Sequence, residues 1–249
     1  MRGSVPDLIR EINRAEYITV LTGAGISTLC GLPDFRGDIQ NPVWEKYPQE
    51  KVFNSDVLRR SPEIFFGFLK EILIKDYTPC VAHHVIKNLE DAGKVKAVIT
   101  QNIDGLHHLA GSKHIYELHG SIYKNYCVAC GRPAGYEEFA ALVREKTVPY
   151  CACGGFIRPD VVFFGEMLPE EDLKMAVYHA SRSDLILVVG TSLLVQPAAY
   201  MPVYTLKNGG KLALINKGET YIDDRASLKL DDIKEVFEEL NRSYGAGGV

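Results

Sequence analysis

The sequence predicts an α/β fold, in which a doubly wound parallel sheet carries a smaller helical and metal-binding module. Four short and almost wholly apolar runs alternate with amphipathic helical patterns along the chain. Such runs are typical of strands buried on both faces of a parallel sheet. The alternation favours helices on both sides of that sheet, in a Rossmann-like arrangement. Two stretches that break the alternation predict the smaller module.

The predicted strands and helices follow one another in a regular order. The apolar runs occupy residues 17–21, 96–99, 184–189 and 211–215. The helical patterns occupy residues 5–15, 82–92, 169–181 and 232–241. We therefore expect a sheet domain built from residues 1–36, 79–121 and 157–249. The small domain is expected to comprise a helical insertion at 37–78 and a cysteine-bearing insertion at 122–156.

Composition and charge exclude several classes of protein. The chain has 249 residues, of which 46% are hydrophobic and 24% charged, as in an ordinary globular protein. With 28 basic and 32 acidic residues the net charge is −4, and no basic stripe predicts nucleic-acid binding. No apolar run approaches the roughly 18 residues of a membrane span. Residues 1–7 lack the apolar core of a signal peptide, so we expect a cytoplasmic protein with reduced thiols.

Small and hydrogen-bonding residues gather where the predicted strands end. The strands are followed by TGAGIS at 22–27, TQNID at 100–104, GTS at 190–192 and NKG at 216–218. The carboxyl edge of an open parallel sheet is where ligands bind. Ordinary polar turns explain one or two of these segments, but they do not predict the sequence of the second one.

Gly23-Ala24-Gly25 lies between a strand and a predicted helix start. Such a loop lets a backbone approach a pyrophosphate. The third glycine of the dinucleotide motif is missing, because position 28 is threonine. A structural turn and a nucleotide loop are therefore both open. The following segment at 33–37 is either a proline-initiated turn or a lid, with Arg36 for phosphate and Phe35 to exclude water.

Four of the six cysteines form two close pairs that are twenty residues apart. They are Cys127, Cys130, Cys151 and Cys153. This spacing is typical of tetrahedral zinc in a reduced compartment. Two disulfides or a redox pair are the alternatives. Four protein ligands close the coordination sphere, so the site is expected to be structural. Cys30 and Cys80 are expected to be ordinary small core residues.

One of the seven histidines is a candidate base. His119 stands in Leu118-His119-Gly120, just before the predicted zinc module, where two domains would meet and ligand clefts form. A neutral imidazole there could act as a general base, although a core or surface histidine is the alternative. His114 and His179 are expected at the surface.

Taken together, these segments resemble the sirtuin family of NAD-dependent protein deacylases, of the prokaryotic type with a single catalytic core. The matching motifs are GAGIS at 23–27, PDFRG at 33–37, TQNID at 100–104, LHG at 118–120, FGE at 164–166 and GTS at 190–192, with the two cysteine pairs. The resemblance spans about residues 21–216. It implies that the sheet domain binds NAD and that the cysteines hold one structural zinc ion.

The resemblance also implies a reaction and a set of site residues. An acetyl group passes from lysine to the ADP-ribose of NAD, releasing nicotinamide and O-acetyl-ADP-ribose. His119 is implied as the base that deprotonates a ribose hydroxyl, and Asn102 holds an ordered water. The remaining residues implied to bind the cofactor are Gly23, Ala24, Gly25, Ser27, Thr28, Asp34, Phe35, Arg36, Gln101, Ile103, Asp104, Gly190, Thr191, Ser192, Asn216, Lys217 and Ile233.

An acetyl-lysine peptide is implied to add as a strand beside Val162, Phe164, Gly165 and Glu166. A mono-ADP-ribosyltransferase that uses the same sugar carbon is the enzymatic alternative. A non-catalytic NAD-sensing or zinc-scaffold protein is the alternative from another class. The presence of both His119 and Asn102 argues against a module that only binds.

Overall fold

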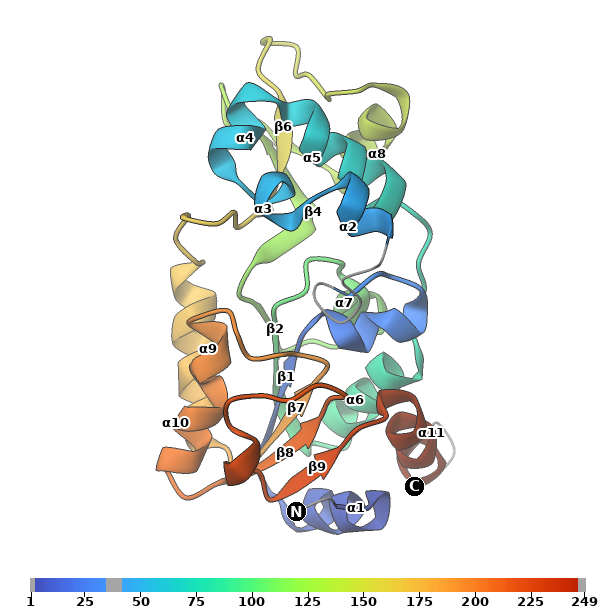
Figure 1. The fold of residues 1–249 in the computed structure, drawn as a ribbon, viewed down its shortest axis with the longest axis vertical. Helices are drawn as coiled ribbons and strands as arrows, with labels where there is room; N and C mark the ends of the chain where they lie inside the picture. The colour runs from blue at the N-terminus through green and yellow to red at the C-terminus, as the bar shows by residue number, and fades with distance from the viewer. Residues whose placement is uncertain (1–2, 35–41, 246–249) are drawn as a thin grey trace.

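The computed structural model describes residues 3–34 and 42–245, and within them it contains one large parallel sheet (Figure 1). The strand order is β3-β2-β1-β7-β8-β9, and every pairing is parallel. The inner strands are β1 (Ile18–Thr22), β2 (Val95–Thr100), β7 (Leu185–Val189) and β8 (Lys211–Ile215). These are the four predicted strands. The edge strands β3 (Ile115–Glu117) and β9 (Leu228–Leu230) have three residues each, and the sequence did not predict them.

Alternate residues of the inner strands enter two different cores. Val20 and Leu187 pack with α1 (Val5–Arg14), α6 (Val81–Asp91) and α11 (Ile233–Tyr244) on one face. Leu21 and Val188 pack with α9 (Glu170–Arg182) and α10 (Met201–Lys207) on the other. All five residues of β1 and of β7 are buried, which explains their unbroken apolar runs. The predicted α/β architecture with helices on both faces is confirmed (Figure 1).

The two inserted stretches build one smaller module above the sheet (Figure 1). Its helical part contains α2 (Pro42–Lys46), α3 (Gln49–Val52), α4 (Ser55–Arg60), α5 (Pro62–Phe68) and a π-helical turn at Leu69–Leu73. Its other part contains α8 (Tyr136–Glu145) and an antiparallel sheet of β5 (Pro133–Ala134), β4 (Gly120–Cys127) and β6 (Ile157–Val161). The two parts share a core in which Phe66 contacts Phe139 with ring centroids 6.4 Å apart.

Local signals account for where the predicted helices begin. Ser4 and Asp7 form a reciprocal capping box at the start of α1, where Pro6 also favours the first turn. Asp232 accepts the backbone N–H of Glu235 and caps α11. The remaining short elements are η1 (Ala24–Cys30), α7 (Leu106–Leu109), η3 (Ala198–Tyr200) and η4 (Asp223–Arg225).

β6 begins at residue 157 and pairs with β4, which begins at residue 120. These two strands therefore run along the boundary that the sequence predicts between the two domains. The predicted domain limits stay a prediction. Within residues 3–34 and 42–245, none of the helices combines the length and apolar character that crossing a bilayer would need.

Candidate active site

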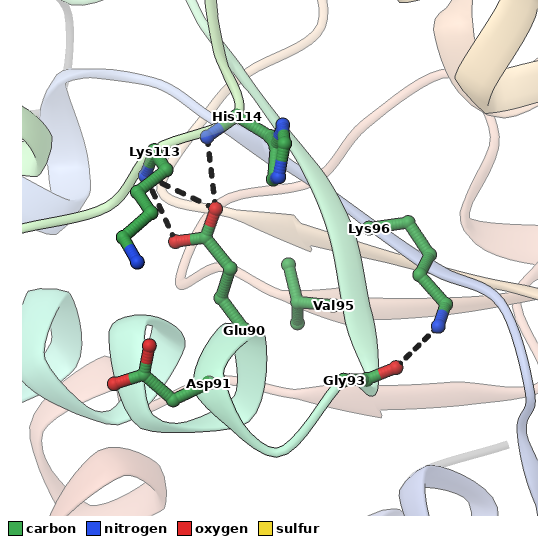
Figure 2. Close-up of a pocket in the computed structure, with 7 residues that line it drawn as sticks. All are labelled: Glu90, Asp91, Gly93, Val95, Lys96, Lys113 and His114. Atoms are coloured by element: carbon green, nitrogen blue, oxygen red, sulfur yellow. Dashed lines mark hydrogen bonds between the residues drawn. The ribbon is translucent and has the colours of Figure 1, made fainter.

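The turns that follow β1, β2, β7 and β8 meet at one edge of the large sheet. Because these strands are direct neighbours and parallel, their carboxyl ends lie side by side. At the opposite end of the strands, where they begin, a pocket of about 320 Å³ lies beside the start of β2 (Figure 2). There Glu90 accepts the backbone N–H groups of Lys113 and His114, so its carboxylate anchors a loop. Those residues implied to bind the cofactor that the structure describes all belong to the carboxyl edge or to the segments that leave it.

The glycines of the first turn are required by packing within the protein. The Gly25 N–H donates to the Gly190 carbonyl at 2.8 Å, and a Cβ on Gly25 would lie 2.7 Å from the Gly190 Cα. Gly190 has a φ of +63°, and its own Cβ would lie 2.4 Å from the Ile26 nitrogen. The turns after β1 and β7 therefore touch through their backbones. The helix that follows Gly23 is the 3₁₀ helix η1 rather than an α-helix.

Asn102 ties the turn after β2 to η1. Its side-chain nitrogen donates to the Gly23 carbonyl at 3.1 Å and to the Ser27 hydroxyl at 3.2 Å. Ser27 in turn donates to the Asp104 carboxylate at 2.7 Å. Burial raises the pKa of Asp104, although hydrogen bonds from the Leu106 N–H and from Ser27 oppose that shift. Asn102, Ser27 and Asp104 thus form one connected polar group at the sheet edge.

His119 contacts the turn after β2 through the backbone of Gln101. The Nδ1 of His119 lies 3.0 Å from the main-chain carbonyl oxygen of Gln101. The Gln101 side chain donates to the Thr191 hydroxyl at 2.9 Å, which extends the network to the turn after β7. Burial lowers the pKa of His119, and the bond to Gln101 only partly offsets this effect. The imidazole is therefore neutral near pH 7.

Gly120 explains why a glycine follows the candidate base. Its φ is +73°, and a Cβ there would lie 1.8 Å from the Asp160 carbonyl oxygen. The close approach comes from the pairing of β4 with β6, in which Gly120 faces Val161. The main-chain carbonyl of His119 also accepts the Val162 N–H at 2.9 Å. The base and the segment implied to bind the peptide are thus directly connected.

The predicted surface position of His179 is wrong. Its ring is nearly buried, with 9% of the residue exposed. Tyr17 and Tyr116 hydroxyls lie 2.8 and 2.9 Å from its two ring nitrogens. The tyrosines precede or belong to strands that are distant in sequence from α9, so no local pattern could have indicated this environment. His114 is exposed, as predicted.

The residues implied to bind the adenosine half occupy the turns after β7 and β8. Thr191 is buried at 7% exposure, whereas Ser192 and Asn216 are partly exposed and Lys217 is exposed. The Asn216 side chain donates to the Gly218 carbonyl at 3.0 Å, which shapes its own turn. Ile233 begins α11 and packs partly against the sheet core.

Of four residues implied to bind the cofactor at or after the first loop, the structure describes two. Thr28 is exposed, and its hydroxyl donates to the Gly25 carbonyl at 2.9 Å. The Asp34 carbonyl accepts the Trp44 indole N–H at 2.9 Å. Phe35 and Arg36 lie outside the described residues, and so does most of the predicted lid.

The segment that follows β6 lies between the two domains. The Phe164 N–H donates to the Phe53 carbonyl at 2.9 Å, and the Phe164 side chain is 50% exposed. Glu166 forms an ion pair with Arg158 at 3.0 Å and accepts the Phe163 N–H at 2.9 Å. Glu166 is therefore engaged in shaping its own segment. Its partner Arg158 stands in no motif that would have indicated this role from the sequence.

Four cysteine sulfurs converge beyond the end of β4. Their Sγ atoms all lie within 4.8 Å of one another, with Cys127 3.4 Å from Cys153 and Cys130 3.9 Å from Cys151. A disulfide needs about 2.05 Å, and all six cysteines are free. Tetrahedral zinc with Zn–S bonds of about 2.3 Å needs sulfurs about 3.8 Å apart, which fits this cluster. The four cysteines are positioned for a zinc site.

Both cysteine pairs form tight turns, although the second pair has only one intervening residue. The Gly131 N–H donates to the Cys127 carbonyl at 2.9 Å, and the Gly154 N–H donates to the Cys151 carbonyl at 3.0 Å. The two glycines have φ values of +71° and +90°, a region that other residues rarely adopt. Gly154 thus lets the shorter pair turn as the longer one does.

Comparisons with known proteins agree with this geometry. A family profile described as the Sir2 family matches residues 23–197. The chain is 43% identical over 241 residues to the NAD-dependent protein deacetylase of Thermotoga maritima, with 96% of each chain covered. It is 43% identical over 238 residues to the NAD-dependent protein deacylase of Thermococcus kodakarensis, covering 92% of this chain and 91% of that one.

Solved structures give the same result. One, of Sir2 with deacetylated p53 peptide and 3′-O-acetyl ADP ribose, superposes with a TM-score of 0.89 at 41% identity, covering 99% of this chain and 100% of that chain. Another, of Sir2 with p53 peptide and NAD⁺, has a TM-score of 0.87 at 41% identity, covering 99% of each chain. With a family match across most of its length and relatives of this similarity, the chain belongs to the Sir2 family, the sirtuins.

Proposed function

We propose that this sirtuin removes acetyl groups from protein lysines and transfers them to the ADP-ribose of NAD, with His119 as the general base. The relatives with the same fold and over 40% identity are NAD-dependent protein deacetylases and deacylases. The observation that carries the assignment of the base is the 3.0 Å contact between His119 Nδ1 and the Gln101 carbonyl. A carbonyl can only accept, so Nδ1 carries the proton and Nε2 keeps a lone pair.

NAD as co-substrate fits the residues at the carboxyl edge of the sheet. Asn102 commits both N–H groups to Gly23 and Ser27, which leaves its amide oxygen to accept from a sugar hydroxyl or water. Asp104 presents a carboxylate that can accept from a nicotinamide carboxamide. The turns with Gly23–Gly25, Thr191–Ser192 and Asn216–Lys217 supply the hydrogen-bonding groups for the rest of the dinucleotide. When bound, NAD supplies the activated sugar carbon that receives the acetyl oxygen.

The protein's own side chains would then act in a fixed order. Gln101 and Asn102 orient the ribose, and the apolar side chain of Ile103 excludes water from the nicotinamide pocket. His119 Nε2 accepts the proton of a ribose hydroxyl, so that this oxygen can attack the carbon of the former acetyl group. The lysine amine then leaves that carbon and a water molecule adds to it, so the reaction yields nicotinamide, free lysine and O-acetyl-ADP-ribose.

An acetylated peptide is the proposed second substrate. Solved relatives hold acetylated and propionylated peptides. In this chain the segment 162–166 is supported as the docking strand, because Phe164 is half exposed between the sheet domain and the small module. Glu166 and its partner Arg158 would act as positioning residues that hold this segment in place.

The two domains would divide near residues 37, 79, 122 and 157. Within the smaller one, the four cysteines would hold one structural zinc ion. Four free thiols in a site of this kind persist only where the surroundings are reducing. A cytoplasmic location therefore fits this proposal.

One assay tests the proposed reaction. The protein is incubated with NAD and an acetyl-lysine peptide, and nicotinamide, peptide mass and acyl product are followed by mass spectrometry. Equal amounts of deacetylated peptide and O-acetyl-ADP-ribose are expected. ADP-ribosylated protein without O-acetyl-ADP-ribose would instead identify a mono-ADP-ribosyltransferase. No turnover at all would favour a module that only binds.

A further inference from the structure

The side chains of Cys30, Cys80 and His83 form a second cluster of metal-ligating groups, separate from the four-cysteine site. Cys30 is the last residue of η1, Cys80 caps α6, and His83 lies in the first turn of α6. The Nδ1 of His83 lies 3.1 Å from the Cys80 Sγ and 3.7 Å from the Cys30 Sγ. Cys30 and Cys80 were expected to be ordinary small core residues, and their convergence could not be predicted because fifty residues separate them in the chain.

The spacing of the three ligand atoms suits a tetrahedral ion. Zinc bonds of about 2.3 Å to sulfur and about 2.05 Å to nitrogen place sulfur and nitrogen ligands about 3.6 Å apart. The two observed sulfur–nitrogen distances fall on either side of that value, and all three atoms lie within 4.8 Å of one another. The four-cysteine cluster shows a similar range, 3.4 and 3.9 Å, between its paired sulfurs.

Burial and charge distinguish this cluster from the structural site. His83 is fully buried, with its ring packed 4.8 Å from the His107 ring, whereas both cysteines are partly exposed. His83 Nε2 has no hydrogen-bond partner in the described residues, so only the Nδ1 side of this ring meets polar groups. Two thiolates and one neutral imidazole balance a divalent charge. The three side chains supply three of the four ligands of a tetrahedral ion.

The cluster is coupled to the loop that carries the proposed cofactor residues. The Cys80 thiol lies 3.6 Å from the Ile26 carbonyl oxygen, to which it donates. Ile26 directly precedes Ser27, the residue that holds both Asn102 and Asp104. Binding of a metal replaces the thiol protons, which pass to solvent, and so removes the bond to Ile26. An ion held by both Cys30 and Cys80 also links η1 to the start of α6.

We propose that Cys30, Cys80 and His83 form a second, reversible metal site for a thiophilic divalent cation such as Zn²⁺, and that its occupation inhibits the enzyme by disturbing η1. The metal site stands on the cluster alone. The inhibition rests on the proposed function, because it assumes that η1 binds NAD.

Zinc stoichiometry tests the site without using activity. The reduced protein is titrated with Zn²⁺ against a chromogenic chelator, and its free thiols are counted before and after. The wild type is expected to bind two ions, the second more weakly because it has three protein ligands. Cys30→Ser and Cys80→Ser should each bind one. His84→Ala alters the exposed neighbour of His83 and should bind two, which makes it the matched control.

The outcomes of the titration are distinct. Binding of a single ion by reduced wild-type protein, or of two ions by both serine variants, would overturn the second site. Loss of two thiols without zinc uptake would show a disulfide and would overturn it as well. Circular dichroism of each variant checks that the fold is retained. Because Cys30 and Cys80 belong to different elements, the test still stands if one of the two serine variants misfolds.

Steady-state kinetics tests the inhibition. Adding micromolar Zn²⁺ should raise the KM for NAD of the wild type about fivefold or more, and Cys30→Ser should remain unaffected. An unchanged KM with two bound ions would overturn the inhibition. Absence of deacetylation before zinc is added would instead refute the proposed function, and it would leave the stoichiometry result intact.

Discussion

His119 donates its Nδ1 proton to the main-chain carbonyl of Gln101, across 3.0 Å. The bond fixes the tautomer and leaves Nε2 as the ring nitrogen that can accept a proton. Because Gln101 also binds Thr191, the orientation of the imidazole is tied to the turns after β2 and β7, the two strands on either side of β1. A rigid attachment of this kind keeps a proton acceptor in one position relative to a bound substrate.

The pH dependence of the reaction follows from the environment of His119. Burial, the larger effect, lowers its pKa below the usual value of 6.5. The base must be neutral, so kcat/KM should rise as pH increases through this lowered pKa and then stay level. We therefore expect the midpoint of the acid limb below pH 6.5, measured with one acetyl peptide at saturating NAD. A midpoint above 6.5 would contradict the assignment.

Removal of the imidazole should separate catalysis from binding. His119→Ala is expected to lower kcat by about 10²–10⁴, the usual contribution of a positioned base. NAD binding, followed by calorimetry, should persist because the turns that we propose to contact the dinucleotide are unchanged. His114→Ala removes an exposed histidine at the opposite edge of the sheet and should retain full activity (Figure 2). A variant at position 119 with more than a tenth of wild-type turnover would exclude it as the base.

The four-cysteine cluster should hold a zinc ion that resists dialysis against a weak chelator. Strong chelation or Cys127→Ser should remove it and lower the melting temperature, because the ion joins β4 to the segment before β6. Elemental analysis and thermal melts measure both effects. Cys30→Ser leaves these four sulfurs intact and is the control that should keep this ion. Finding no zinc in freshly prepared reduced protein would refute the prediction.

The sequence predicted the inner part of the large sheet because burial on both faces leaves an unbroken apolar run. The edge strands β3 and β9 escaped prediction, since each has three residues and only one of them is buried. Their place in the sheet is set by pairing with longer strands. Only tertiary contact could therefore identify them.

The candidate site, like the sheet, was predictable only where it follows from the order of the strands. Parallel strands bring their carboxyl ends together, so the four turns could be assigned to one edge from the chain alone. The cluster of Cys30, Cys80 and His83 and the burial of His179 depend on residues far apart in the sequence. The glycine loop shows a second limit of prediction from sequence. Gly25 is required by its contact with Gly190 whether or not a pyrophosphate binds, so the glycine alone does not indicate a nucleotide loop.

Gly120 offers a test of how the fold places the base. Gly120→Ala would set a methyl group 1.8 Å from the Asp160 carbonyl at a φ of +73°, so β4 and β6 must separate where the candidate base is held. Gly93→Ala imposes a similar φ of +70° with no atom within 4 Å, and so isolates the cost of the backbone conformation.

We expect Gly93→Ala to cost about 1 kcal/mol, or about 2–4 °C in Tm for a chain of this size. Gly120→Ala should cost about 3 kcal/mol or more, because overpacking adds to the same backbone strain. Thermal melts of both variants measure the difference. Gly120→Ala should also lower kcat at temperatures where the protein is still folded, since His119 directly precedes the displaced residue. Equal Tm values for the two variants would mean that the contact with Asp160 relaxes freely and that β6 does not hold the base in place.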